Sequence, residues 1–201
     1  MANVILDNLP NTISIGNNEY QINTDFKNWL EFHRLLTKRE PTGEDVINAF
    51  SWVLPVLPNH EADVVIDQLI DFMTLEKEEE KNDDEPMLMR DLMEDSIEKP
   101  YEPPVLDYDF DADYIYSAFL QQYGINLREA NMHWFEFKAL FKGLTDNVKL
   151  TKIIGYRAVS GSEYAQMSKS EKKHINEMKR IYALPDHRTA EEKEADFASG
   201  L

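Results

Sequence analysis

Apolar residues return every three or four positions along most of this chain, which is the period of an α-helix. The clearest example is a segment whose apolar side chains would share one helical face: Ala62, Val65, Ile66, Leu69, Ile70 and Met73. Six further segments show the same spacing, at residues 26–36, 46–53, 114–122, 127–144, 150–154 and 171–182. In the second of these, Ile47 shares a face with Phe50 and Val53, and Pro55 or Pro58 ends the helix. Gly124 is expected to end the helix at 114–122, and Asn126–Glu129 has the Asn-x-x-Glu form that can open the next one. The pattern predicts a mainly α-helical fold.

One segment near the amino terminus has a different period. Thr12–Ile15 and Glu19–Ile22 alternate polar and apolar residues, and Gly16-Asn17-Asn18 between them tolerates the positive φ of a tight turn. We therefore expect a short amino-terminal β-hairpin. The side chains of Asn23-Thr24-Asp25 can then cap the first helix.

Composition divides the chain into two small helical modules. Residues 76–104 contain 12 acidic and 4 basic residues and end in a proline-rich run. Charge repulsion and proline disfavour a packed fold, so this stretch is interpreted as an acidic linker. The expected modules are the hairpin with three helices at residues 1–75 and a helical module at 105–185. Residues 186–201 are expected to be a frayed, charged tail.

An apolar strip inside the linker is the candidate partner-binding site: Met87, Leu88, Met89, Leu92 and Met93. Exposed apolar groups invite aggregation, so an acidic tether seldom carries them without a function. Methionine is flexible and polarisable, which suits contact with varied helical partners. We expect a short amphipathic helix that docks either on the chain's own carboxy-terminal module or on a partner.

Charge and hydropathy exclude several classes of partner. The formal net charge is -17, from 38 acidic and 21 basic residues, and it repels nucleic acid and anionic lipid. The chain has no cysteine, hence no disulfide framework and no cysteine zinc site. Met1–Asp7 does not resemble a signal peptide, and no stretch approaches the roughly 20 apolar residues that span a bilayer. We expect a cytoplasmic protein without nucleic-acid or membrane partners.

The sequence contains no recognisable catalytic or cofactor motif. It lacks a glycine-rich phosphate loop, a Gly-x-Ser-x-Gly elbow and a His-Glu-x-x-His pair, and its five histidines are scattered. Triads converge in space rather than in sequence, so this absence lowers the expectation of an enzyme without excluding one. We predict no enzymatic activity and no cofactor.

Alternating carboxylates at Asp107–Asp113 resemble the first half of an EF-hand loop. That loop requires glycine at its sixth position and a bidentate carboxylate at its twelfth, where this chain has Ala112 and Ala118. The favoured interpretation is a solvated, helix-capping acidic stretch without a metal.

The last predicted helix begins with a capping box, Ser168-Lys169-Ser170-Glu171. This helix is locally basic, with Lys169, Lys172, Lys173, Lys179 and Arg180. Nucleic acid is one partner for such a face, but the sequence shows no set of aromatic residues that would stack on bases. Pairing with the acidic linker, or a solvated face, is the favoured interpretation.

Several segments, in this order and spacing, resemble the bacteriophage gene-product-fifteen family of siphophages and prophages of Gram-positive bacteria. They are Tyr20–Phe26, Asp109–Leu120, Gln121–Leu127, Met132–Leu140 and Lys149–Arg157. The similarity covers roughly residues 10 to 185, and the linker and the tail are its variable parts.

The resemblance implies a role in phage tails. Genes of this family typically precede the tape-measure gene, a position that tail assembly chaperones usually occupy. The implied function is a non-enzymatic chaperone that binds the tape-measure protein, with the tail-tube protein as a further candidate partner. The alternatives are a structural or tail-completion component of the virion and, least favoured, a host-directed regulatory protein.

Overall fold

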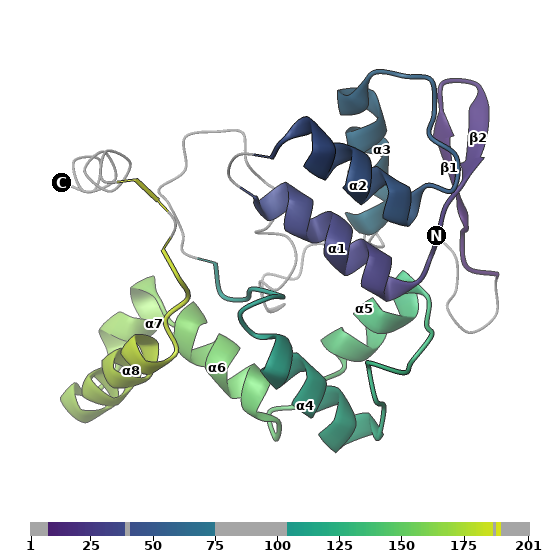
Figure 1. Ribbon diagram of the computed structural model, residues 1–201. Coiled ribbons are helices and arrows are strands. Elements are labelled where there is room, and N and C mark those ends of the chain that lie inside the picture. The colour runs from purple at the N-terminus through teal and green to yellow at the C-terminus, as the bar shows by residue number, and fades with distance from the viewer. Residues whose placement is uncertain (1–7, 39–40, 75–103, 187, 190–201) are drawn as a thin grey trace. The chain divides into compact units, whose positions relative to one another are not determined.

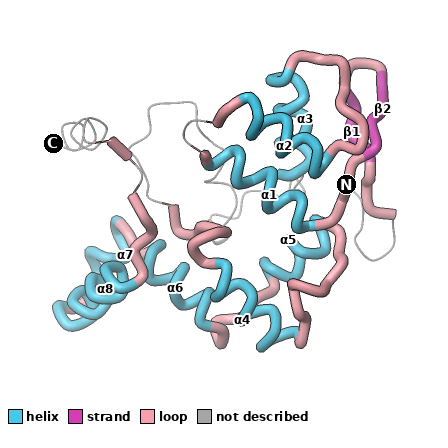
Figure 2. The backbone as a smooth tube through the Cα atoms, viewed as in Figure 1, coloured by secondary structure: helices cyan, strands magenta, loops and turns pink. Residues whose placement is uncertain are grey.

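The computed structural model describes residues 8–38, 41–74, 104–186 and 188–189. Within these ranges it forms one hairpin and eight helices (Figure 1, Figure 2). The elements are β1 (Thr12–Ile15), β2 (Asn18–Gln21), α1 (Phe26–Thr37), α2 (Gly43–Val53), α3 (Ala62–Thr74), α4 (Ala112–Tyr123), α5 (Trp134–Lys142), α6 (Lys149–Ala158), α7 (Gly161–Gln166) and α8 (Lys169–Ile181). The predicted mainly helical class with a short amino-terminal hairpin is confirmed.

The chain divides into two compact units, but the division differs from the predicted one. Unit 1 comprises the described residues of Met1–Asp83 and Gly124–Leu144, and unit 2 those of Asp84–Tyr123 and Thr145–Leu201. The sequence predicted a single module at 105–185, whereas residues 124–144 of that range belong to unit 1. Helical periodicity shows which face of a helix is apolar, but it does not show which other helices that face packs against.

Two predicted segments fall largely outside the described residues. Only Pro104 of the acidic linker at 76–104 is described. The predicted tail at 186–201 is described only at Asp186, Arg188 and Thr189.

The hairpin and α1 form where the sequence predicts them. β1 and β2 are antiparallel, with Thr12 opposite Gln21, and Gly16 in the turn adopts a φ of 61° that a side chain would disfavour. Asp25 caps α1, because its Oδ1 accepts a hydrogen bond from the N–H of Lys27 (2.9 Å). In unit 1, α2 packs on α1 and α3 packs on β1.

The face that α2 buries is narrower than predicted. Its buried residues are Ala49, Phe50 and Val53, whereas Ile47, which the sequence grouped with Phe50 and Val53, is exposed. A capping box begins this helix, with Oγ1 of Thr42 accepting from the N–H of Asp45.

Aromatic side chains from α1, α3 and α5 form the core of unit 1. The ring of Trp29 lies 4.7 Å from that of Phe72 and 6.4 Å from that of Trp134, measured between centroids. Phe26 and Phe137 stack at 4.8 Å. All five side chains are buried, so α5 supplies a part of the core that residues 8–74 lack.

Main-chain hydrogen bonds attach the segment before α5 to the segment before α1. The N–H of Phe26 donates to the carbonyl of Met132 (3.1 Å), and the N–H of Trp134 donates to the carbonyl of Thr24 (2.7 Å). These two bonds flank an antiparallel bridge between Asp25 and His133. The amino-terminal ends of α1 and α5 are therefore fixed to each other.

Side chains add to this attachment. Nζ of Lys27 donates to the carbonyls of Arg128 (3.2 Å) and Ala130 (2.8 Å). The ring of His133 caps α5, its Nδ1 accepting from the N–H of Phe135 (3.1 Å). In a neutral ring the proton then resides on Nε2, which lies 3.0 Å from the carbonyl of Pro10 and donates to it.

The sequence placed the start of this helix too early. Asn126–Glu129 was predicted to open it, but these residues form a turn in which the N–H of Arg128 donates to Oδ1 of Asn126 (3.1 Å). Histidine is an uncommon capping residue, so the true start at His133 gives only a weak sequence signal.

Unit 2 contains α4, α6, α7 and α8, with α6 packed on both α4 and α8. Gly124, at a φ of 68°, follows α4 as predicted. Oε1 of Gln122 accepts hydrogen bonds from the N–H (2.9 Å) and the hydroxyl (3.1 Å) of Thr145. These bonds join the end of α4, where the chain leaves unit 2, to Thr145, where the chain returns to it.

The capping box of α8 was predicted from Ser168-Lys169-Ser170-Glu171 and is present. The N–H of Ser168 donates to Oε2 of Glu171 (2.7 Å), and the N–H of Glu171 donates to Oγ of Ser168 (3.3 Å). The carboxylate of Glu171 accepts hydrogen bonds from the hydroxyl and from the N–H of Ser168, and these, the hydroxyl first, hold the pKa of Glu171 below its ordinary value. The box therefore stabilises α8 above the pKa of an unfolded glutamate, and this contribution is lost as the pH falls through the lowered value.

We expect Ser168→Ala to raise the pKa of Glu171 towards that of an ordinary glutamate, because the substitution removes the serine hydroxyl. A carbon-13 NMR titration of the Glu171 carboxyl group measures this change. Ser117→Ala, at an exposed serine of α4, serves as the control. An unchanged pKa in Ser168→Ala would contradict the capping geometry.

Candidate functional site

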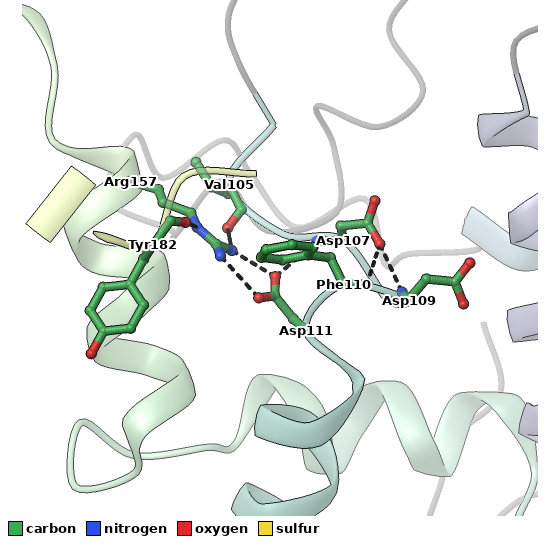
Figure 3. A network of polar contacts seen from close by, with 7 residues as sticks. All are labelled: Val105, Asp107, Asp109, Phe110, Asp111, Arg157 and Tyr182. Carbon is green, nitrogen blue, oxygen red and sulfur yellow. Dashed lines mark hydrogen bonds and ion pairs between the residues drawn. The ribbon is translucent and has the colours of Figure 1, made fainter. Parts of the chain in front are cut away.

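A buried ion pair between Arg157 and Asp111 is the main polar feature of unit 2 (Figure 3). Nη1 and Nη2 of Arg157 donate to the two carboxylate oxygens of Asp111 at 2.6 and 2.9 Å. The side chains are only 6% and 0% exposed, respectively. The two parallel bonds match the fork of the guanidinium group, which is the strongest geometry for such a pair.

The same guanidinium group connects three parts of unit 2. Nε of Arg157 donates to the carbonyl of Tyr182 (2.7 Å), after α8, and Nη1 donates to the carbonyl of Val105 (3.0 Å), before α4 (Figure 3). Asp111 in turn accepts from the N–H of Asp107 (3.1 Å). The contacts of this pair are internal, so its evident function is to hold unit 2 together.

The acidic stretch Asp107–Asp113 therefore has two roles, only one of which was predicted. Oδ1 of Asp107 accepts from the N–H groups of Asp109 and Phe110, each at 2.8 Å, so it caps a turn as expected (Figure 3). The sequence was interpreted as placing Asp111 in solvent, and this was wrong. Asp111 is buried against Arg157. The described residues bring no three histidine or carboxylate side chains into a metal-binding group.

The role of Arg157 was not predicted from the sequence, where this residue only ends the segment Lys149–Arg157 of the family resemblance. The signal was the pairing of two otherwise unexplained features, a run of carboxylates and an arginine late in an apolar helix. A buried arginine requires a charged partner, but sequence alone does not say which carboxylate supplies it.

Half-buried aromatic side chains lie beside the lysine that begins α6. Nζ of Lys149 lies over the rings of Tyr114 (4.8 Å) and Tyr182 (5.6 Å). Tyr156 stacks on Tyr182 at 6.3 Å and meets His174 edge-on at 5.8 Å. Because these rings pack on one another, they stabilise the ends of α4, α6 and α8.

Two of the basic side chains of α8 bind main-chain carbonyls of their own unit. Nζ of Lys172 donates to the carbonyl of Ala165 (3.0 Å), and Nζ of Lys179 donates to that of Val159. The ammonium groups of Lys172 and Lys179 thus have hydrogen-bond acceptors within unit 2. The predicted pairing with the acidic linker involves residues outside the described ranges and stays a prediction.

Exposed apolar side chains gather in one part of unit 1. Eight large apolar side chains are exposed in the described ranges, and five of them lie between residues 47 and 64: Ile47, Trp52, Val56, Leu57 and Val64. We call residues 47–64 the exposed apolar segment. It spans α2 from Ile47 onward, the loop after this helix and the first turn of α3 (Figure 1). A soluble domain rarely concentrates exposed apolar groups in this way unless they contact a partner.

The loop within this segment is held in place at both ends. The N–H of Asn23 donates to the carbonyl of Val53 (2.8 Å), at the end of α2. The ring of His60 meets that of Tyr20 on β2 edge-on at 6.2 Å. The apolar side chains at Val56 and Leu57 are thus carried on a loop that is fixed against the hairpin.

The predicted partner-binding residues lie outside the described ranges: Met87, Leu88, Met89, Leu92 and Met93. Their role stays a prediction. The exposed apolar segment was missed because its apolar residues were assigned to helix faces or to a helix end near Pro55 and Pro58. A run of apolar residues broken by two prolines, without a helical period, is the signal that indicates a surface loop.

In the described part of the chain, no helix is both long and apolar enough to cross a membrane.

Comparison with protein families gives a match that covers most of the chain. Residues 5–184 match the family model described as "Bacteriophage Gp15 protein". No curated protein and no solved structure matches the chain significantly. The family match covers both units and includes every segment that carried the resemblance seen in the sequence.

Proposed function

Because the chain belongs to the bacteriophage Gp15 protein family, we propose that it is a non-enzymatic tail assembly chaperone that binds the tape-measure protein while the tail is built. The structural observation that carries the proposal is the exposed apolar segment of unit 1. A chaperone of this kind must present apolar surface to a long, aggregation-prone partner and remain soluble itself.

The charge of the chain meets the second requirement. A formal net charge of -17 opposes self-association, since it repels further copies of the same chain. The chaperone would act in the cytoplasm of the infected or lysogenic bacterium, where tails assemble.

Particle composition separates a chaperone from a virion component. We expect quantitative mass spectrometry of purified phage particles to find the protein absent or far below the copy number of any tail protein. We also expect co-expression to raise the soluble fraction of the tape-measure protein several-fold, because the apolar segments of that protein would be covered.

A fixed copy number of the protein in particles, one matching the tail tip or tail end, would instead identify a structural or tail-completion component. Recovery of a host protein and no tail protein from infected cells would support the host-directed alternative. Tape-measure protein that aggregates equally with and without co-expression would contradict the chaperone role.

A further inference from the structure

The exposed apolar segment lies in a stretch of unusual charge. Residues 41–74 contain six carboxylate side chains and no lysine or arginine. The carboxylates belong to Glu44, Asp45, Glu61, Asp63, Asp67 and Asp71, and all of these residues except Asp45 are exposed. The apolar side chains on α2, on the following loop and on α3 therefore lie in a stretch whose own charges are all negative, and the ion pair of Lys38 with Asp45 (2.6 Å) neutralises one of the six.

This charge limits what can cover the segment. A second copy of the chain would bring two acidic surfaces together, and like charges placed against each other cost association energy. The chain's own residues 76–104, with 12 acidic and 4 basic residues, are repelled for the same reason. A partner with positive charge around an apolar stripe would bind favourably to both the exposed apolar side chains and the carboxylates.

We propose that residues 47–64 form a docking surface for a basic amphipathic α-helix of another protein. The apolar stripe of that helix would cover Trp52, Val56 and Leu57, and its lysine or arginine side chains would face Glu61, Asp63 and Asp67. If the proposed chaperone function holds, the inference also specifies which tape-measure segments are bound, namely basic amphipathic ones.

Trp52 provides a direct optical test. The chain has three tryptophans, and Trp29 and Trp134 are buried in the core of unit 1, whereas Trp52 is 37% exposed. Acrylamide should therefore quench the emission of Trp52 preferentially. A helix that covers the surface should shift this emission to shorter wavelength and protect it from the quencher.

The probe is a synthetic 18-residue peptide of leucine and lysine in amphipathic order, added to the full-length protein at about 0.15 M salt. A scrambled peptide of the same composition lacks the apolar stripe, and a leucine–glutamate peptide keeps the stripe but reverses the charge. We expect binding of the first peptide only, with the emission shift abolished in Trp52→Phe.

Matched variants locate the binding surface. Val56 and Leu57 are 70% and 51% exposed, so the V56S/L57S pair should leave the melting temperature unchanged and weaken peptide binding by about 10-fold or more. The control pair L120S/I181S alters two exposed apolar residues of unit 2 and should bind as the natural protein does. E61Q/D67N should weaken binding several-fold and reduce its dependence on salt.

Equal binding of the ordered and the scrambled peptide would overturn the proposal, because charge alone would then explain the association. Equal loss in V56S/L57S and in L120S/I181S would overturn it as well. Neither result involves a tail protein, so failure here leaves the chaperone role to be decided by the particle and co-expression measurements.

Discussion

Trp134→Ala is expected to lower the free energy of unfolding by about 3–5 kcal/mol. The indole ring is buried between Trp29 and Phe137, at centroid distances of 6.4 and 5.7 Å. Its Nε1 also donates to the carbonyl of Met73 (2.9 Å), near the end of α3. Truncation leaves a cavity and removes a partner from a buried carbonyl.

Urea denaturation followed by circular dichroism measures this loss. Trp52→Ala removes a side chain of the same size from a partly exposed position, so it is expected to cost less than half as much. Trp134→Phe should give an intermediate value, because it keeps most of the ring packing but not the hydrogen bond. Equal losses in Trp134→Ala and Trp52→Ala would show that α5 is not part of the core of unit 1.

Arg157→Ala is expected to destabilise unit 2 by about 3–5 kcal/mol, because it leaves the buried carboxylate of Asp111 without its charged partner. The substitution also frees the carbonyls of Val105 and Tyr182, which hold the two ends of the unit to α6. Arg157→Lys should recover little of the loss, since an ammonium group cannot make the two parallel bonds to the carboxylate.

A double-mutant cycle tests whether the loss arises from the ion pair. The variant with both Asp111→Asn and Arg157→Met contains no unpaired charge, so its loss should be well below the sum of the two single losses. Arg34→Ala breaks the exposed pair with Glu31 and should cost about 1 kcal/mol or less. Additive losses at Asp111 and Arg157 would contradict the assigned role of the pair.

Local structure was largely predictable from the sequence because its signals act over a few residues. The alternation around Gly16, the cap at Asp25 and the capping box at Ser168 each use neighbouring side chains and main-chain groups. The predicted and observed structures agree at all three places.

Long-range packing was not predictable in the same way. α5 was expected to join the carboxy-terminal module because it follows α4 in the chain, and its apolar face would suit either unit. Its place in unit 1 is specified by partners more than 50 residues away, such as Phe26 and Met73. The pairing of Arg157 with Asp111, which are 46 residues apart, was hidden for the same reason.

The candidate binding surface was hidden for a different reason. Ile47 fits a helical apolar stripe as well as Phe50 does, and only the position of α1 decides which of the two is buried. Burial is therefore a property of the assembled unit, and exposed apolar residues cannot be separated from core residues by periodicity.

The course of the chain between the units has a consequence for its synthesis. Residues 8–74 leave the ribosome without the rings of Trp134 and Phe137, which complete their core. At typical elongation rates of about 5–20 residues per second, the ribosome needs roughly 4 to 14 s to add residues 75–144. During that interval the nascent chain exposes Phe26, Trp29 and Phe72, so unit 1 completes its folding only after α5 has been made.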